Sequence, residues 1–277
     1  MAIAIVLLLV AVGSVVFHLV SPWWWTPIAS NWGYIDATLN ITFLITGAVF
    51  VAVIGFMAYC VWRFRHKAGQ TALYEPENKK LEWWLTIATA VGVAAMLAPG
   101  LYVWHQFVTV PKEASEVEIV GRQWSWSYRL PGKDGKLGTS DPLNVSADNP
   151  LGLNPNDPNG KDDVIIESGE LHLQIGKPVK VLLRSIDVLH DFYVPEFRAK
   201  MDMIPGLVTF FWMTPTRTGT FDSLCAELCG VGHSQMRGSV VVAEAAAYQA
   251  WLEKQQTFAE LSGGPRTLKA NYEPASK

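Results

Sequence analysis

Charged residues are scarce in the first part of this 277-residue chain. None precedes Asp36, and residues 37–62 and 83–111 contain none either. Asp, Glu, Lys and Arg make up 17% of the whole sequence, against roughly 25% in ordinary soluble domains. Most of the charge lies in residues 112–277. The sequence therefore predicts a hydrophobic N-terminal part and a separate globular domain long enough to bury its own core.

The chain has no excess of basic residues and few cysteines. The net charge is -3 and the pI is near 6.1, which argues against nucleic acid as a partner. Only three cysteines are present. No Cys-x-x-Cys-His sequence occurs, so the sequence predicts no c-type haem attached to this chain. Cys60 lies within an apolar run, where a small and inert side chain is expected.

Two long apolar runs are present where charge is missing. Residues 37–62 and 83–111 each exceed the ~20 residues that a membrane-spanning helix needs. The alternative is a buried helical hairpin in a large soluble protein, but these runs are too long and too free of charge for it. We therefore predict that residues 36–111 form a transmembrane α-helical hairpin in contact with membrane lipid.

The first 20 residues are apolar too, so residues 1–35 form either an additional span or a signal peptide. A signal peptide has a positively charged start and a small-residue cleavage site. This sequence has no Lys or Arg ahead of the apolar run and no clear Ala-x-Ala near its end. We favour a third span, with Trp23, Trp24 and Trp25 at the membrane interface, where indole rings are stabilised.

The loop between the two longer runs predicts their orientation. This loop is rich in basic residues, and basic loops stay in the cytoplasm. Residues 112–277 must then lie on the other side, in the periplasm of a bacterium or the intermembrane space of a mitochondrion. We expect a multi-pass protein of the bacterial inner membrane. The basic residues are Arg63, Arg65, Lys67, Lys79 and Lys80.

Residues 112–243 have the pattern of an all-β domain. Short apolar or alternating runs are separated by Gly and Pro turns, as in a sandwich or barrel. After this domain, Ala245–Leu261 predicts one amphipathic helix and a polar tail follows from Ser262, so residues 244–277 form a C-terminal helix and tail. The expected strands are Val117–Val120, Val164–Ile166, Leu171–Ile175, Val179–Leu183, Leu207–Trp212 and Gly238–Val242.

The residues best suited to bind a metal lie close together in sequence. Cys225, Cys229, His233 and Met236 provide two thiols, an imidazole and a thioether, the soft set that suits copper electron-transfer sites. A second imidazole, His190, follows Asp-Val-Leu upstream, and a separate strand can bring it to the same place. A single copper needs only one thiolate, so two thiolates four residues apart could bridge two coppers.

Two other interpretations of the cysteine pair are a disulfide and a zinc site. A disulfide is common in oxidising compartments, but it would leave His190, His233 and Met236 without a role. Zinc prefers Cys and His in a closed tetrahedron and has little use for Met. Copper accounts for the whole set.

The pattern Cys-x-Glu-x-Cys-Gly-x-x-His-x-x-Met, with the upstream Asp-Val-Leu-His, closely resembles the CuA motif of cytochrome c oxidase subunit II. The resemblance covers nearly the whole chain after residue 35. It implies a cupredoxin-like domain that accepts electrons from a c-type cytochrome at a dinuclear copper centre. The electrons would pass to haem in subunit I of a proton-translocating oxidase, which reduces oxygen to water. Subunits I and III would be partners.

The same resemblance implies a role for each ligand. Two thiolates would bridge both coppers, a His and a Met would complete one copper, and the other His with a backbone carbonyl would complete the second. The Glu227 carboxylate would also reach a magnesium or manganese ion at the contact with subunit I. By this resemblance, the bridging thiolates would be Cys225 and Cys229. The ligands of one copper would be His190 and Met236, and those of the other would be His233 and the Glu227 backbone carbonyl.

Three aromatic residues alternate in Gln123-Trp124-Ser125-Trp126-Ser127-Tyr128, which predicts a strand with the aromatics on one face. Packing in the core is the simplest explanation. The family has an aromatic-rich segment here, typically Trp-Tyr-Trp-Ser-Tyr, whose first Trp is where electrons enter. Trp124 holds that position. Ser125 departs from the pattern, because an aromatic residue is usual there, and this departure bears on how the cytochrome packs.

Glu82 stands at the start of the second long run, in Leu81-Glu82-Trp83-Trp84. A carboxylate there suits the positive end of a helix. The resemblance implies another role, because the family has a Glu at this place that serves the entrance of a proton channel into subunit I, and membrane-edge carboxylates can donate protons. The residues after Glu82 differ from the usual Ile-Trp-Thr.

The segment Asp141–Glu170 contains seven acidic residues and one basic residue, Lys161. Its Pro, Asn and Gly content predicts a long loop. The loop is either a solvated excursion or part of a docking surface that attracts a basic cytochrome c. A calcium site in Asp157–Asp163 is a further alternative, although the spacing misses the EF-hand pattern.

Other functions share parts of this pattern. Quinol oxidase subunit II lacks the copper ligands, and nitrous oxide reductase has a similar copper domain but no membrane hairpin. A membrane-tethered copper-delivery protein would need one exchangeable copper. A nitric oxide reductase with the same kind of copper subunit stays open, because this chain alone does not reveal the catalytic partner.

Overall fold

The computed structural model describes residues 1–277 except 22–25, 72–73, 75, 147, 168 and 264–277. Trp23, Trp24 and Trp25 therefore lie outside the described residues. The chain divides into two compact units. The first comprises residues 1–27 and 32–107, and the second comprises residues 28–31 and 108–277.

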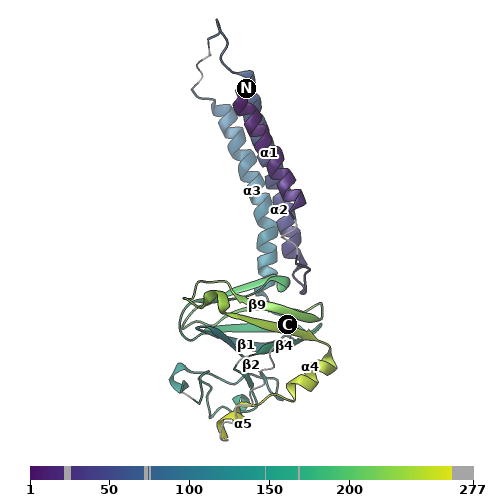
Figure 1. Cartoon of the computed structure of the whole chain (residues 1–277), viewed down its shortest axis with the longest axis vertical. Coiled ribbons are helices and arrows are strands. Elements are labelled where there is room, and N and C mark those ends of the chain that lie inside the picture. Colours follow the sequence, from purple (N-terminus) through teal and green to yellow (C-terminus); the bar gives the residue numbers. More distant parts are fainter. Residues whose placement is uncertain (22–25, 72–73, 75, 147, 168, 264–277) are drawn as a thin grey trace. The chain divides into compact units, whose positions relative to one another are not determined.

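The described part of the first unit contains three helices that are long and apolar enough to cross a membrane. They are α1 (Ala2–Val20), α2 (Gly33–Arg63) and α3 (Lys79–Val108), of which α1 and α2 pack against each other (Figure 1). Most of their side chains are exposed, as expected for helices that face lipid or other membrane helices. The predicted helical hairpin is confirmed, and residues 2–20 form a third helix of spanning length.

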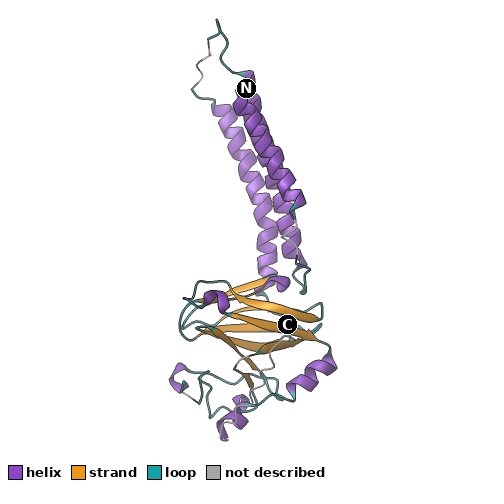
Figure 2. Cartoon of the chain, in the orientation of Figure 1, coloured by secondary structure: helices purple, strands orange, loops and turns teal. Residues whose placement is uncertain are grey.

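The described part of the second unit contains ten strands in two five-stranded sheets (Figure 2). The sheets have the orders β3-β2-β1-β5-β8 and β4-β10-β9-β6-β7. Residues of β5 alternate between buried and half-buried, as expected for a sheet with one face in the core. The strands are β1 (Ser115–Arg122), β2 (Ser125–Leu130), β3 (Val164–Ile166), β4 (Glu170–Gln174), β5 (Val179–Ser185), β6 (His190–Val194), β7 (Ala199–Met203), β8 (Thr209–Met213), β9 (Gly219–Cys225) and β10 (Arg237–Ala243).

The six strands predicted from alternation are present, each within two residues of its expected ends. The predicted all-β domain is thereby confirmed. Sequence reasoning missed β6, β7 and β9 because charged residues interrupt their apolar patterns. The aromatic strand is shorter than predicted, since β2 starts at Ser125 and Trp124 lies in the turn before it. Trp126 and Tyr128 are buried, whereas Trp124 is 39% exposed.

The single helix predicted for Ala245–Leu261 is wrong, because two shorter helices are present. These are α4 (Ala245–Leu252) and α5 (Phe258–Gly263). The residues between them bond to the rest of the domain instead of continuing the helix. The Ile165 backbone N–H donates to the Gln256 carbonyl at 3.2 Å, and the Phe258 N–H donates to the Asp163 carbonyl at 2.8 Å.

A long excursion, residues 131–163, connects β2 to β3 and includes most of the predicted acidic loop. Buried ion pairs fix it to the first sheet. The Arg129 guanidinium lies 2.8 Å from Glu118 on β1 and 2.8 Å from Asp163 at the end of the excursion. The excursion is therefore folded against the domain, although it contains only short 3-10 turns.

Candidate metal centre

Separate segments of the second unit meet at the cysteine pair. His190 is the first residue of β6 and Cys225 is the last residue of β9. These strands are antiparallel neighbours, with Phe192 opposite Cys225. The loop of residues 226–236 then leads to β10. The sheet register thus places the upstream histidine beside the cysteine loop, as the sequence predicts.

The ligand atoms lie at distances suited to shared metals. The Cys225 and Cys229 Sγ atoms are 3.7 Å apart. Next to Cys225 Sγ lie His190 Nδ1 at 3.8 Å and the Glu227 carbonyl oxygen at 3.2 Å. Next to Cys229 Sγ lie His233 Nδ1 at 3.6 Å and Met236 Sδ at 3.9 Å. Ligands on one tetrahedral metal with bonds of about 2.0–2.3 Å are separated by roughly 3.3–3.8 Å.

The arrangement fits the donor set of a dinuclear copper site. Each thiol has two further ligand atoms beside it, so both sulfurs can be shared by two metals. No disulfide joins Cys225 and Cys229, and Met236 is buried with its thioether facing Cys229. Over the described residues, His190, Cys225 and Cys229 form the one group of three or more His, Cys or acidic side chains whose ligand atoms lie within 4.8 Å of one another. The acidic side chains of Asp157–Asp163 form no such group, so the geometry does not support a calcium site there.

Burial sets the state of the Cys229 thiol. It raises the pKa of Cys229 to about 11, and the neighbouring Cys225 thiol acts in the same direction. Such a thiol holds little negative charge unless a cation displaces its proton. Cys229 is therefore suited to bind a metal ion and poorly suited to act as a free nucleophile.

Asp187 orients the histidine ligand. Its Oδ1 lies 2.8 Å from His190 Nε2, so that nitrogen carries the proton and Nδ1 presents a lone pair toward Cys225. The backbone N–H groups of Gln123 and Val188 also donate to this carboxylate, each at 2.6 Å. Burial acts to raise the pKa of Asp187, but the donors from Gln123, His190 and Val188 bring it below its usual value.

Trp124 lies against the same loop. Its indole Nε1 donates to the Cys229 carbonyl oxygen at 3.2 Å. A Cβ added to Gly232 would overlap the indole ring, so the absence of a side chain there lets the ring approach the loop backbone. The structure thus brings Trp124 to the cysteine pair although the residues are far apart in sequence.

The remaining predicted residues lie elsewhere or have other contacts. Glu227 is half-buried beside the thiols. Glu82 is exposed in the first turn of α3, in the other unit. In the acidic loop, Asp157 accepts hydrogen bonds from Thr139 and Asn159. The docking role of that loop stays a prediction.

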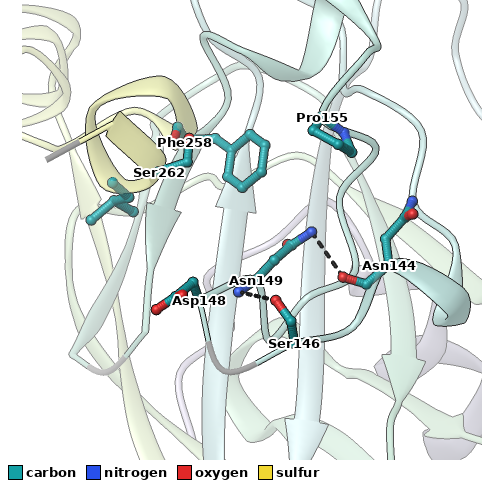
Figure 3. Close-up of a pocket in the computed structure, with 8 residues that line it drawn as sticks. Asn144, Ser146, Asp148, Asn149, Pro155, Phe258 and Ser262 are labelled. Carbon is teal, nitrogen blue, oxygen red and sulfur yellow. Dashed lines mark hydrogen bonds between the residues drawn. The ribbon is translucent and has the colours of Figure 1, made fainter.

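A pocket of about 490 Å³ lies between the excursion and α5, shown in Figure 3. None of its lining residues is a cysteine, histidine or methionine, so it is separate from the sulfur cluster. The lining residues are Asn144, Ser146, Asp148, Asn149, Pro155, Phe258, Leu261 and Ser262.

Sequence reasoning missed Gln123. Its side-chain Nε2 donates to the Cys229 carbonyl at 2.8 Å, although the two residues are 106 positions apart. Its position beside Trp124 was one available signal. Gly230 and Gly232 are a second signal, because glycines in a loop often mark the place where another chain segment approaches closely.

Comparisons with known proteins identify the family of this chain. A family model for the periplasmic domain of cytochrome c oxidase subunit II matches residues 116–245. The alternative cytochrome c oxidase subunit 2 of Bradyrhizobium diazoefficiens is 71% identical over 272 residues, covering 98% of this chain and 98% of the relative. Cytochrome c oxidase subunit 2 of Cereibacter sphaeroides is 28% identical over 83% of this chain and 77% of that protein.

Among solved structures, the periplasmic domain of subunit II of cytochrome oxidase of Bradyrhizobium japonicum is 29% identical. It covers 52% of this chain and 95% of that chain, with a TM-score of 0.39. The similarity to the Bradyrhizobium diazoefficiens protein extends over nearly the full length of both chains. It confirms the predicted family, the predicted oxidoreductase class and the predicted cupredoxin-like domain. The chain therefore belongs to the cytochrome c oxidase subunit II family and is a subunit of a haem–copper oxidase, an oxidoreductase complex.

Proposed function

We propose that this chain holds a dinuclear copper centre and passes electrons from a c-type cytochrome to haem in subunit I, where oxygen is reduced to water and protons are translocated. The observation that supports this most strongly is the ligand arrangement around the two thiols. Each sulfur has two further ligand atoms at 3.2–3.9 Å. A disulfide or a single zinc site would leave several of these atoms without a role.

The protein's part is to hold the ligands still. His190 and Cys225 stand on neighbouring strands, and Asp187 holds the histidine ring. A rigid ligand frame keeps the reorganisation energy of electron transfer low. The centre itself, when bound, would supply a site that exchanges one electron with little change in its bond lengths.

Trp124 is the proposed point at which the electron enters. It is partly exposed to an approaching donor, and its indole N–H bonds to the Cys229 carbonyl. One electron would leave the ferrous haem of the cytochrome, which becomes ferric, and the copper centre would gain that electron. Trp124 therefore offers a short path from the surface to a proposed ligand residue.

The remaining roles follow from membership of the family. Glu227 would bind magnesium or manganese at the contact with subunit I, and Glu82 would serve the entrance of a proton channel. Subunit III is a further proposed partner. We place the protein in the bacterial inner membrane, with residues 112–277 in the periplasm. This location is supported by three helices of spanning length and by the basic loop between α2 and α3.

The copper proposal is tested by replacing single cysteines in the purified oxidase. Cys225→Ser and Cys229→Ser should each remove two coppers relative to the wild type, because a hydroxyl is a poor bridging ligand. The mixed-valence EPR signal of the centre should disappear with them. Cys60→Ser is the matched control, since Cys60 lies in α2 and should change neither quantity. Equal copper contents in all four proteins, or zinc in place of copper, would contradict the proposal.

A further inference from the structure

The turn between β1 and β2 contributes two hydrogen bonds to the same acceptor. Trp124 Nε1 donates to the Cys229 carbonyl oxygen at 3.2 Å, and Gln123 Nε2 donates to that oxygen at 2.8 Å. A carbonyl oxygen has two lone pairs and can accept both donors. The shorter bond comes from Gln123, a residue that has no part in the copper ligation proposed above.

The acceptor belongs to a peptide that needs to be held. The Cys229 carbonyl precedes Gly230, whose φ of +117° lies in a region that only glycine adopts readily. Glycine leaves a neighbouring peptide plane with more rotational freedom than other residues do. Two donors on the carbonyl fix the plane, and with it the oxygen that Trp124 uses.

Gln123 is itself anchored. Its backbone N–H donates at 2.6 Å to the carboxylate of Asp187, which in turn holds the ring of His190. One residue thus connects the histidine segment to the cysteine loop, and it does so next to Trp124. The indole N–H makes a single hydrogen bond, its ring lies against Gly232, and Trp124 is 39% exposed, so the ring depends on the loop backbone for its position.

We propose that Gln123 is a positioning residue for electron transfer: it fixes the Cys229–Gly230 peptide so that Trp124 stays in electronic contact with the centre. This inference rests on the proposed function, in which electrons pass from Trp124 to copper. Gln123 touches neither the metal nor the reacting atoms, so it acts through Trp124.

The test uses the intact oxidase with a soluble c-type cytochrome that carries a photoactive ruthenium label. Gln123→Met keeps the length of the side chain and removes the donor. The intracomplex electron-transfer rate should fall roughly three- to tenfold, the equivalent of one lost hydrogen bond. The EPR spectrum of the copper centre and the Kd for the cytochrome should stay as in the wild type. Gln249→Met, at an exposed position on α4, makes the same chemical change outside the turn and the cysteine loop, and as the matched control it should leave the rate unchanged.

A double-mutant cycle separates positioning from a merely structural effect. In a Trp124→Phe background the indole N–H is gone, so Gln123→Met should cause no further loss of rate. The proposal is overturned if Gln123→Met leaves the rate unchanged, lowers it equally in both backgrounds, or removes copper. If Trp124→Phe alone leaves the rate unchanged with copper intact, the proposed point at which electrons enter is itself wrong, which is a different result.

Discussion

At the residue scale, local spacing predicted which sulfur and imidazole side chains lie together, but not the groups that hold them. Cys225, Cys229, His233 and Met236 lie in one loop, so their spacing is visible in the sequence. For Asp187, the sequence alone favours an exposed charge that attracts the cytochrome. In the structure its carboxylate accepts N–H groups from Gln123, Val188 and His190. Those contacts depend on how the chain folds, and no local pattern predicts them.

These contacts change what a substitution at Asp187 should do. Asp187→Ala removes both acceptor oxygens, so none of the three N–H groups keeps its partner. Because His190 then loses its orienting partner, copper affinity should fall about 10- to 100-fold. Titration of the oxidase with a copper chelator measures this loss. Asp222→Ala, an exposed change on β9, is the control and should retain copper.

A docking role for Asp187 would give another result. Copper affinity would then be unchanged, while the association rate with the cytochrome would fall most strongly at low salt, because exposed charges are screened over about 10 Å at 0.1 M ionic strength. Measuring both quantities on the same variant distinguishes a carboxylate that orients a ligand from one that attracts a partner.

At the scale of elements, length and periodicity predicted the helices and most strands, while tertiary contacts decided the rest. The break between α4 and α5 shows why. Thr257 and Glu260 form a reciprocal cap, in which the Thr257 N–H donates to Glu260 Oε2 at 2.8 Å and the Glu260 N–H donates to Thr257 Oγ1 at 3.4 Å. The pattern Thr-x-x-Glu is a helix start signal. This pattern in the sequence predicts that a second helix begins near Thr257.

The contact between α4 and β4 should depend on pH. The His172 ring stacks on Trp251 with centroids 4.1 Å apart and an interplanar angle of 7°. Burial lowers the pKa of His172, while the Glu170 carboxylate, 3.4 Å from Nε2, opposes this. Because the folded state favours the neutral ring, this contribution to stability is present above the unfolded pKa of about 6.5 and is lost as pH falls through the lower folded value.

Hydrogen exchange of the α4 amides measures this effect. Exchange, corrected for its intrinsic pH dependence, should show weaker protection at about pH 5.5 than at about pH 7.5, on either side of the usual histidine pKa. His172→Phe keeps an aromatic ring against Trp251 but cannot be protonated, so its protection should be the same at both pH values. An equal loss of protection in the wild type and in His172→Phe would show that another group controls α4.

At the scale of the whole molecule, a short segment between α1 and α2 bears on the membrane topology. Residues 28–31 belong to the same unit as the β domain. The Ala29 N–H donates to the Glu196 carbonyl at 2.7 Å, and Ser30 Oγ donates to the Phe197 carbonyl at 2.7 Å. In the proposed membrane arrangement, the start of α2 and the end of α3 therefore face the same side of the membrane. The basic loop between α2 and α3 then faces the other side.

Cysteine labelling tests this topology in right-side-out spheroplasts. Gln70→Cys places a thiol in the loop, and Gln70 is a better choice than Gly69, whose φ of +81° favours glycine. A membrane-impermeant maleimide should fail to label Gln70→Cys until the membrane is permeabilised, because the basic loop stays in the cytoplasm. Lys177→Cys, exposed in the β domain, should react from outside at once. Labelling of Gln70→Cys in intact spheroplasts, beyond that of the parent protein, would reverse the proposed orientation and move the copper centre to the cytoplasmic side.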